Sequence, residues 1–162
     1  MVLVVDFDGT YLKNDFFAEQ FYKKLIENPF YLLGHWISGG NNLLALKNKL
    51  LANVTLQYPL EQLVNPVVAD FIQANRQSYT KVVLVSASPD EFVKRILAAD
   101  KTFDVVSGST DINLKGDKKT AFIRNTFGDD FHYVGDSASD IPIYRSAKKG
   151  FVVKSTGVYE YK

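Results

Sequence analysis

An apolar segment at the start of the chain runs directly into two acidic residues. Four aliphatic residues at 2–5 are followed by Asp6 and, two positions later, by Asp8. Side chains two positions apart on an extended segment point to the same side, so both carboxylates would face one spot where the chain leaves a buried strand at Gly9. Carboxylates so close together need a shared proton or a cation. The alternative is that Asp8 and Gly9 only form a turn.

Short segments rich in β-branched and aromatic residues alternate with helical segments over much of the chain. The predicted strands are residues 2–5, 81–86, 103–108, 131–136 and 150–154. The predicted helices are residues 89–100, 118–128 and 139–149. Continuous apolar strands that alternate with helices are typical of a parallel sheet covered on both faces. The predicted fold class is therefore α/β, with a Rossmann-like sheet.

The segment between the first and second strands breaks this alternation. Residues 13–78 have a helical pattern throughout, and Asn14 or Asp15 is suited to cap the first helix. We expect a small all-helical cap inserted after the first strand, and a core domain made of residues 1–12 and 79–162. The cap would lie over the carboxyl edge of the sheet, where open α/β sheets bind ligands.

Three features define the helices expected within this cap. Residues 29–40 are apolar enough for a core helix, and the alternative is a surface that touches lipid. Leu43, Leu46 and Leu50 recur at helical spacing and predict a buried stripe. A last helix starts again at Pro66, because proline is not tolerated in a helix interior.

Composition excludes several classes of function. Lysine and arginine number 19 against 18 acidic residues, so no overall field directs the chain to nucleic acid. The absence of cysteine excludes disulfides, thiolate zinc sites and thiol nucleophiles, and it fits a cytoplasmic location. No uncharged apolar run reaches the roughly 18 residues of a membrane span, and Asp6 interrupts the N-terminal apolar run too early for a signal peptide.

The second predicted strand ends in a hydroxyl-rich stretch. Ser86 follows the apolar run, and the next helix is expected to begin near Pro89. A hydroxyl and unpaired backbone N–H groups just before a helix form a corner that binds oxyanions. Ser88 and Glu91 have the spacing of a capping box, which would leave Ser86 available for a ligand.

Charged groups also gather near the third and fourth strands. Lys115, Lys118 and Lys119 surround a helix start, where cations oppose the helix dipole. The functional interpretation is that one ammonium points inward at an anion, and the alternative is a solvated cluster. Asp136 ends the fourth strand, and Asp140 follows one helical turn later. If this strand neighbours the first one, the carboxylates converge, and a ligand set of oxygens alone favours Mg²⁺. The alternative for Asp136 taken alone is a helix cap.

Together these stretches resemble the signature motifs of the haloacid dehalogenase-like (HAD) phosphohydrolases. The matching segments are DFDGT at 6–10, Ser86 after an apolar strand, a lysine within 115–119 and GDSASD at 135–140. The insertion at 13–78 is placed like the helical, C1-type cap of phosphoserine phosphatase relatives. More narrowly, the chain is similar to the HAD domain that precedes UbiA-like membrane prenyltransferases in some proteins.

The resemblance implies catalytic roles for three residues. Asp6 would attack phosphorus and form an aspartyl-phosphate. Asp8 would be the general acid and base, which requires burial and like charge to keep it partly protonated. Lys119, just ahead of two apolar positions, would neutralise the aspartyl-phosphate, with Lys115 as the alternative and Lys118 solvated.

The resemblance also implies ligands for the substrate and for a metal. For the phosphoryl group they are Thr10, Ser86, Ala87 and Lys115, and for Mg²⁺ they are Asp6, Asp8, Asp136 and Asp140. Asp8 would contribute its main-chain carbonyl to the metal. Asp140 would act by orienting a metal-bound water or the lysine.

The activity implied is Mg²⁺-dependent hydrolysis of a small-molecule phosphate monoester. The acid at position 8 favours a phosphatase or phosphotransferase, because the dehalogenases and ion pumps of the family lack it. A phosphotransferase or mutase on the same fold, and a catalytically idle regulatory or binding module, are the alternatives.

Aromatic residues of the predicted cap indicate the kind of leaving group. They are Phe16, Phe17, Phe21, Tyr22, Phe30, Tyr31 and Trp36. Together with the prenyltransferase resemblance, they favour an apolar or ring-containing group over phosphoserine, in a membrane-adjacent pathway. Asp15 lies where phosphoserine phosphatases carry an acid that contacts the substrate, although helix capping explains it equally well.

Overall fold

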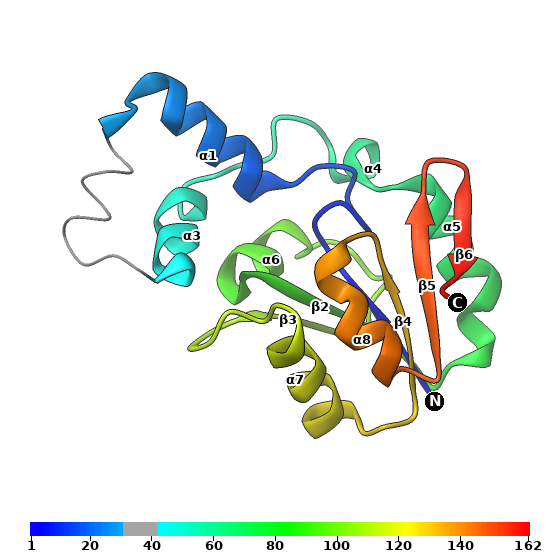
Figure 1. Cartoon of the computed structure of the whole chain (residues 1–162). Helices are drawn as coiled ribbons and strands as arrows, with labels where there is room; N and C mark the ends of the chain where they lie inside the picture. The colour runs from blue at the N-terminus through cyan, green and yellow to red at the C-terminus, as the bar shows by residue number, and fades with distance from the viewer. Residues whose placement is uncertain (31–41) are drawn as a thin grey trace.

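A six-stranded sheet forms the centre of the molecule (Figure 1). The structure, a computed structural model, describes residues 1–30 and 42–162. The strands are β1 (Val2–Val5), β2 (Lys81–Pro89), β3 (Val105–Ser109), β4 (Phe131–Gly135), β5 (Lys149–Lys154) and β6 (Gly157–Glu160). Their order is β3-β2-β1-β4-β5-β6. The first strand in sequence is therefore central, between β2 and β4.

All strand pairs are parallel except the last. β1 pairs with β2 and β4, and β5 pairs with β6 in antiparallel orientation. The predicted α/β fold with a parallel sheet is confirmed. The strand β6 was not predicted, because it is short and partly exposed and follows β5 after a tight turn at 155–156. Such a strand lacks the continuous apolar run of a buried parallel strand.

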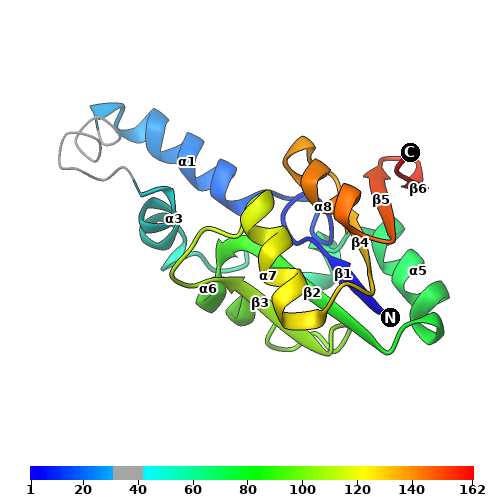
Figure 2. The same cartoon turned by 60° about the horizontal axis from the view of Figure 1, so that its bottom comes forward.

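Helices cover both faces of the sheet, as predicted (Figure 2). They are α1 (Phe16–Glu27), α3 (Leu43–Leu51), α4 (Leu60–Leu63), α5 (Pro66–Asn75), α6 (Asp90–Ile96), α7 (Asp117–Phe127) and α8 (Ile141–Ser146). Leu3 and Val5 pack with residues of α5 and α6 in one core cluster. Val2 and Val4 pack with residues of α7 and α8 in the other. Successive side chains of β1 point to opposite faces of the sheet, and both faces are buried. Its whole sequence is therefore apolar.

The segment predicted as a cap divides into two parts. Helices α1 and α3 stand beyond the carboxyl edge of the sheet and contact each other (Figure 1). Helix α5 instead packs on the sheet, because Val68 and Ile72 are buried beside Leu3 and Leu84. The cap boundaries of 13–78 stay a prediction, and within that range α5 packs with residues of the sheet.

The local details of the cap also differ from the prediction. Asp15 caps α1 by accepting a hydrogen bond from the N–H of Ala18. In α3 the buried residues are Leu44, Leu46, Lys47 and Leu51. Of the predicted stripe, Leu46 is buried as expected, Leu50 is half-buried and Leu43 is 43% exposed. Pro66 does begin a new helix, capped by the side chain of Asn65.

Part of the predicted cap cannot be compared with the structure. Tyr31, Trp36 and most of the helix expected at 29–40 lie outside the described residues. Among the residues that are described, no helix is long and apolar enough to cross a membrane.

The end of β2 extends further than predicted. The strand continues to Pro89, and α6 begins at Asp90 without a side-chain cap. The capping box predicted from Ser88 and Glu91 is wrong, because the Ser88 hydroxyl donates to Asp8 instead. The extension carries Ser86, Ala87 and Ser88 beyond the tip of β1, where the acidic residues lie.

Candidate active site

The central position of β1 brings the two acidic stretches together. The register pairs Val5 of β1 with Val134 of β4, and the N–H of Asp6 donates to the carbonyl of Val134 at 2.9 Å. Asp6 and Asp136 therefore follow the ends of neighbouring strands. The carboxylates were predicted to converge if these two strands were neighbours, and β1 and β4 do pair.

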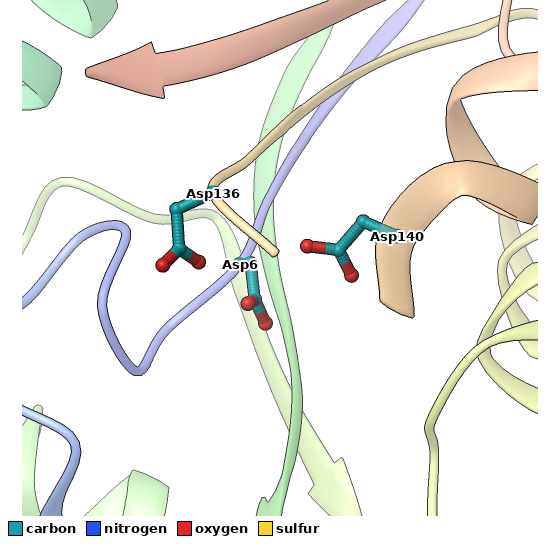
Figure 3. A group of neighbouring side chains, drawn as sticks. All are labelled: Asp6, Asp136 and Asp140. Atoms are coloured by element: carbon teal, nitrogen blue, oxygen red, sulfur yellow. The ribbon is translucent and has the colours of Figure 1, made fainter. Parts of the chain in front are cut away.

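Three carboxylates meet at this edge (Figure 3). One oxygen from each of Asp6, Asp136 and Asp140 lies within 4.8 Å of the others. Asp6 and Asp140 are buried, at 8% and 2% exposure. Burial, followed by the nearby charge of Asp6, raises the pKa of Asp140 above its ordinary value. Such a group of oxygens is chemically suited to a hard divalent cation such as Mg²⁺.

Both oxygens of Asp140 are already hydrogen-bonded to the protein. Tyr133 donates to Oδ1 at 3.0 Å, and the N–H of Ser137 donates to Oδ2 at 3.2 Å. The latter bond belongs to a capping box with Ser137 at the start of the short 3₁₀ helix Ala138–Asp140. Asp140 is thus held rigidly beside the other two acids.

Gly9 allows the close approach of Asp136 to the turn after β1. Its φ angle is +75°, and a Cβ at this position would lie 2.6 Å from Oδ2 of Asp136. Any other residue would be strained in this conformation and would displace the carboxylate. The turn considered as an alternative reading of Asp8 and Gly9 therefore exists, but it forms part of the acidic site.

Asp8 faces the same cavity but lies outside the group of three carboxylates. Its Oδ2 accepts a hydrogen bond from the Ser88 hydroxyl at 2.6 Å. Its Oδ1 is buried without a hydrogen-bond partner in the described part of the chain. Burial raises the pKa of Asp8 to about 7; the Ser88 hydrogen bond opposes this and the charge of Asp6 adds to it. A carboxyl with this pKa can both give and take a proton near neutral pH.

The three candidate lysines occupy different environments. Lys119 is 2% exposed, and its ammonium donates to Oδ1 of Asp6 at 2.6 Å. Lys115 is exposed and lines the cavity, and Lys118 is exposed on α7. Lys119 is therefore the lysine in direct contact with Asp6.

Besides Lys115, the residues expected at the phosphoryl group differ in their contacts. Thr10 is fully buried and donates to Oδ1 of Asp136 at 2.9 Å, so its contact orients an acid. Ser86 is also fully buried, and its Oγ accepts the N–H of Ser88 at 2.9 Å. Ala87 lines the cavity directly, together with Ser88.

A cavity of about 360 Å³ lies between the acidic edge and the helices α1 and α3. The core contributes the four acids Asp6, Asp8, Asp136 and Asp140, together with Lys115 and Lys119. The cap helices and the turn before them contribute Asp15, Phe17, Leu43 and Lys47. The cavity therefore has a charged floor and a wall that is partly apolar.

Sequence reasoning missed Lys47, which connects the cap to the core. Lys47 is buried, at 7% exposure. Its ammonium donates to the carbonyl of Ala87 at 2.7 Å and lies 5.5 Å from the ring centre of Phe17. Burial lowers its pKa from the ordinary value, with the charge of Asp8 opposing this. The available signal was a single cation four residues from both Leu43 and Leu51 on an apolar helix face.

Comparison with known proteins agrees with this arrangement. A family model described as haloacid dehalogenase-like hydrolase matches residues 3–145. An uncharacterized protein, y4nM, of Sinorhizobium fredii is 31% identical over 160 residues. That match covers 96% of this chain, and the chain spans only 30% of the length of this relative.

Solved structures share the fold at low sequence identity. An HAD family hydrolase from Salmonella enterica serovar Typhi superposes with a TM-score of 0.59 at 14% identity, covering 90% of this chain and 60% of that one. A phosphoserine phosphatase in its apo form has a TM-score of 0.59 at 19% identity, with coverage of 92% and 84%. The narrower resemblance to prenyltransferase-linked domains stays a prediction.

The pKa of Asp8 predicts how stability depends on pH. Between the ordinary value of 3.8 and about 7, the folded chain holds a proton at Asp8 that the unfolded chain has released. This contribution to the free energy of unfolding is complete below the lower value and is lost as pH rises, by up to about 1.4 kcal/mol per pH unit. We expect Asp8→Asn to gain stability over the wild type as pH increases through this window.

Urea unfolding with chelator present, at about pH 5 and about pH 8, measures this difference. Asp70→Asn, an exposed change on α5, is the control and should follow the wild type at both pH values. A difference between Asp8→Asn and the wild type that is the same at both pH values would contradict a raised pKa at Asp8.

Proposed function

Because this chain belongs to the haloacid dehalogenase-like hydrolase family, we propose that it is a phosphatase of small-molecule phosphate monoesters. The observation that carries the proposal is the pairing of two different acids at one cavity. Asp6 is bound to the ammonium of Lys119, whereas Asp8 is buried with a pKa near 7. One acid is suited to attack as an anion and the other to carry a proton.

In the first half of the proposed reaction, an oxygen of Asp6 attacks phosphorus and the bond from phosphorus to the ester oxygen breaks. Protonated Asp8 gives its proton to the departing oxygen, which leaves as an alcohol. The ammonium of Lys119, 2.6 Å from Asp6, stabilises negative charge on the phosphoryl group of the resulting aspartyl-phosphate.

In the second half, Asp8 takes a proton from water while the water oxygen attacks phosphorus. The bond between phosphorus and Asp6 breaks, and inorganic phosphate is released. Asp6 returns to its carboxylate form and Asp8 is again protonated, so the cycle is closed. The Ser88 hydroxyl, 2.6 Å from Asp8, holds this carboxyl in place through both halves.

Mg²⁺ fits the acidic edge of the cavity. Asp6 and Asp136, together with the main-chain carbonyl of Asp8, would hold the ion, with Asp140 and Thr10 orienting the ligands. When bound, the ion supplies positive charge that offsets the repulsion between the attacking carboxylate and the phosphate.

The cap wall bears on the choice of leaving group. Phe17 and Leu43 line the cavity and offer apolar surface, while Lys47 of α3 binds the carbonyl of Ala87 near the end of β2. We infer that an apolar or ring-containing leaving group packs on Phe17 and Leu43. Tyr31 and Trp36, the other aromatic residues expected in this wall, lie outside the described residues.

Two alternatives remain on the same fold. A phosphotransferase or mutase would pass the phosphoryl group from Asp6 to an alcohol, so adding glycerol to the assay and comparing phosphate release with glycerol phosphate formation separates it from a phosphatase. A catalytically idle binding module would turn over no phosphate ester at all. The intact pairing of Asp6 with Lys119 and of Asp8 with Ser88 favours an active enzyme.

Replacing the nucleophile tests the proposed chemistry. We expect Asp6→Asn to lower turnover of an aryl phosphate by at least roughly 10³-fold, because the change is nearly isosteric and removes the attacking charge. Circular dichroism should report an unchanged fold, and Asp70→Asn should keep wild-type turnover. If Asp6→Asn retained more than about a tenth of the wild-type rate, the covalent mechanism would be excluded.

Removing the metal tests the role of the acidic edge. We expect chelator to abolish turnover and added Mg²⁺ to restore it, whereas Ca²⁺ should inhibit because it prefers more ligands at longer distances. Asp136→Asn should raise the Mg²⁺ concentration needed for half-maximal rate, on the order of 10-fold or more. Full activity of the chelated protein would remove Asp136 from the set of ligands.

Shortening the cap wall tests the inferred leaving group. We expect the wild type to prefer an aryl phosphate to phosphoserine, and Phe17→Ala to raise KM for the aryl ester roughly 10-fold, the scale of about 1.4 kcal/mol of lost uniform binding. Phe21→Ala is the matched control, because Phe21 contacts Phe17 at a ring distance of 5.8 Å without lining the cavity. A wild-type preference for phosphoserine, or equal effects of Phe17→Ala on both esters, would refute the apolar leaving group.

A further inference from the structure

A tyrosine in β4 carries a polar group into the floor of the site. The five residues of β4 are all buried, and Tyr133 has no exposed surface. Its ring packs in the core cluster under α7 and α8, beside Val4, Ile123 and Ile143. An apolar side chain of similar size would satisfy this packing, so the hydroxyl requires a separate explanation.

The hydroxyl of Tyr133 joins two residues of the site. It accepts a hydrogen bond from the ammonium of Lys119 at 3.3 Å and donates to Oδ1 of Asp140 at 3.0 Å. These directions are fixed, because an ammonium can only donate and the single hydroxyl hydrogen then goes to the carboxylate. With the bond from Lys119 to Asp6, a continuous chain runs from Asp6 through Lys119 and Tyr133 to Asp140.

We propose that Tyr133 is a positioning residue for the reaction, whose hydroxyl orients the Lys119 ammonium toward Asp6 and holds the Asp140 carboxylate beside the metal-binding acids. This inference rests on the proposed function. Tyr133 itself touches neither substrate nor metal, and it acts through the two residues that it binds.

The charged groups around position 133 explain why a neutral tyrosine hydroxyl is suited to it. A buried ammonium has three hydrogens to satisfy, and a long lysine side chain held by one acceptor keeps rotational freedom. A carboxylate as the second acceptor would add a fourth negative charge beside Asp6, Asp136 and Asp140. A neutral hydroxyl accepts from Lys119 without that repulsion and also supplies a donor to Asp140.

The test removes this hydroxyl alone. Tyr133→Phe should lower kcat for an aryl phosphate by about 10- to 100-fold, the usual scale for a residue that orients metal-site and catalytic groups. KM should change by less than about threefold, because the bonds lost serve the chemical step rather than binding of the ester.

Tyr144 provides a matched control in the same core cluster. Its ring meets that of Tyr133 edge-on at 5.6 Å, and its hydroxyl is buried without a hydrogen-bond partner in the described residues. Tyr144→Phe therefore removes an equivalent buried hydroxyl without breaking the chain of bonds. We expect its kcat to stay within about twofold of the wild type. The proposal is overturned if Tyr133→Phe also stays within this range, or if both variants lose activity equally.

A double-mutant cycle of unfolding measurements tests the same contact without an activity assay. If the hydroxyl holds Lys119, the shift in urea midpoint caused by Tyr133→Phe should be smaller in a Lys119→Met background than in the wild type. Equal shifts in the two backgrounds would show that the two side chains are not coupled and would overturn the proposal. A wild type without phosphatase activity would refute the proposed function, while this cycle would still decide whether Tyr133 positions Lys119.

Discussion

The ion pair between Lys119 and Asp6 is the contact on which the site depends. Parallel pairing of β1 and β4 places Asp6 and Asp136 at one edge, and Asp140 follows one turn later, so three acids are forced together. Without a compensating positive charge, the repulsion between these carboxylates in a partly buried site would oppose folding. Lys119 reaches this edge from the first turn of α7, which begins at Asp117. A bound cation would complete the compensation that one ammonium begins.

Much of the site was predictable because it follows from strand ends. The carboxyl ends of parallel strands meet at one edge of a sheet, so an acid directly after an apolar run can be placed without knowing any side-chain contact. This argument located Asp6, Asp8 and Asp136, and it also placed Ser86 near them. The family resemblance, with the two apolar positions after Lys119, favoured this residue among three lysines, and Lys119 is the one of the three that contacts Asp6.

The residues that sequence reasoning missed or misassigned depend on packing in three dimensions. Thr10 is expected at the phosphoryl group, and in the structure its buried hydroxyl donates to Asp136, a contact that the sequence does not indicate. Lys47 contacts Ala87, 40 residues away, and no local pattern reveals such a partner. The helix α5 has the same helical periodicity whether it packs on the sheet, as it does, or on α1 and α3. Periodicity identifies a helix and its apolar face, but not the surface which that face covers.

The antiparallel direction of β6 determines where the chain ends. Glu160 pairs with Phe151, and the N–H of Tyr161 donates to the carbonyl of Gly150, so the last residues lie beside the start of β5. Met1 lies beside the start of β1, at the same edge. Both termini thus lie on the side of the sheet opposite the cavity. An affinity tag or a surface attachment joined at Met1 or at Lys162 would therefore begin on the side of the sheet away from the cavity.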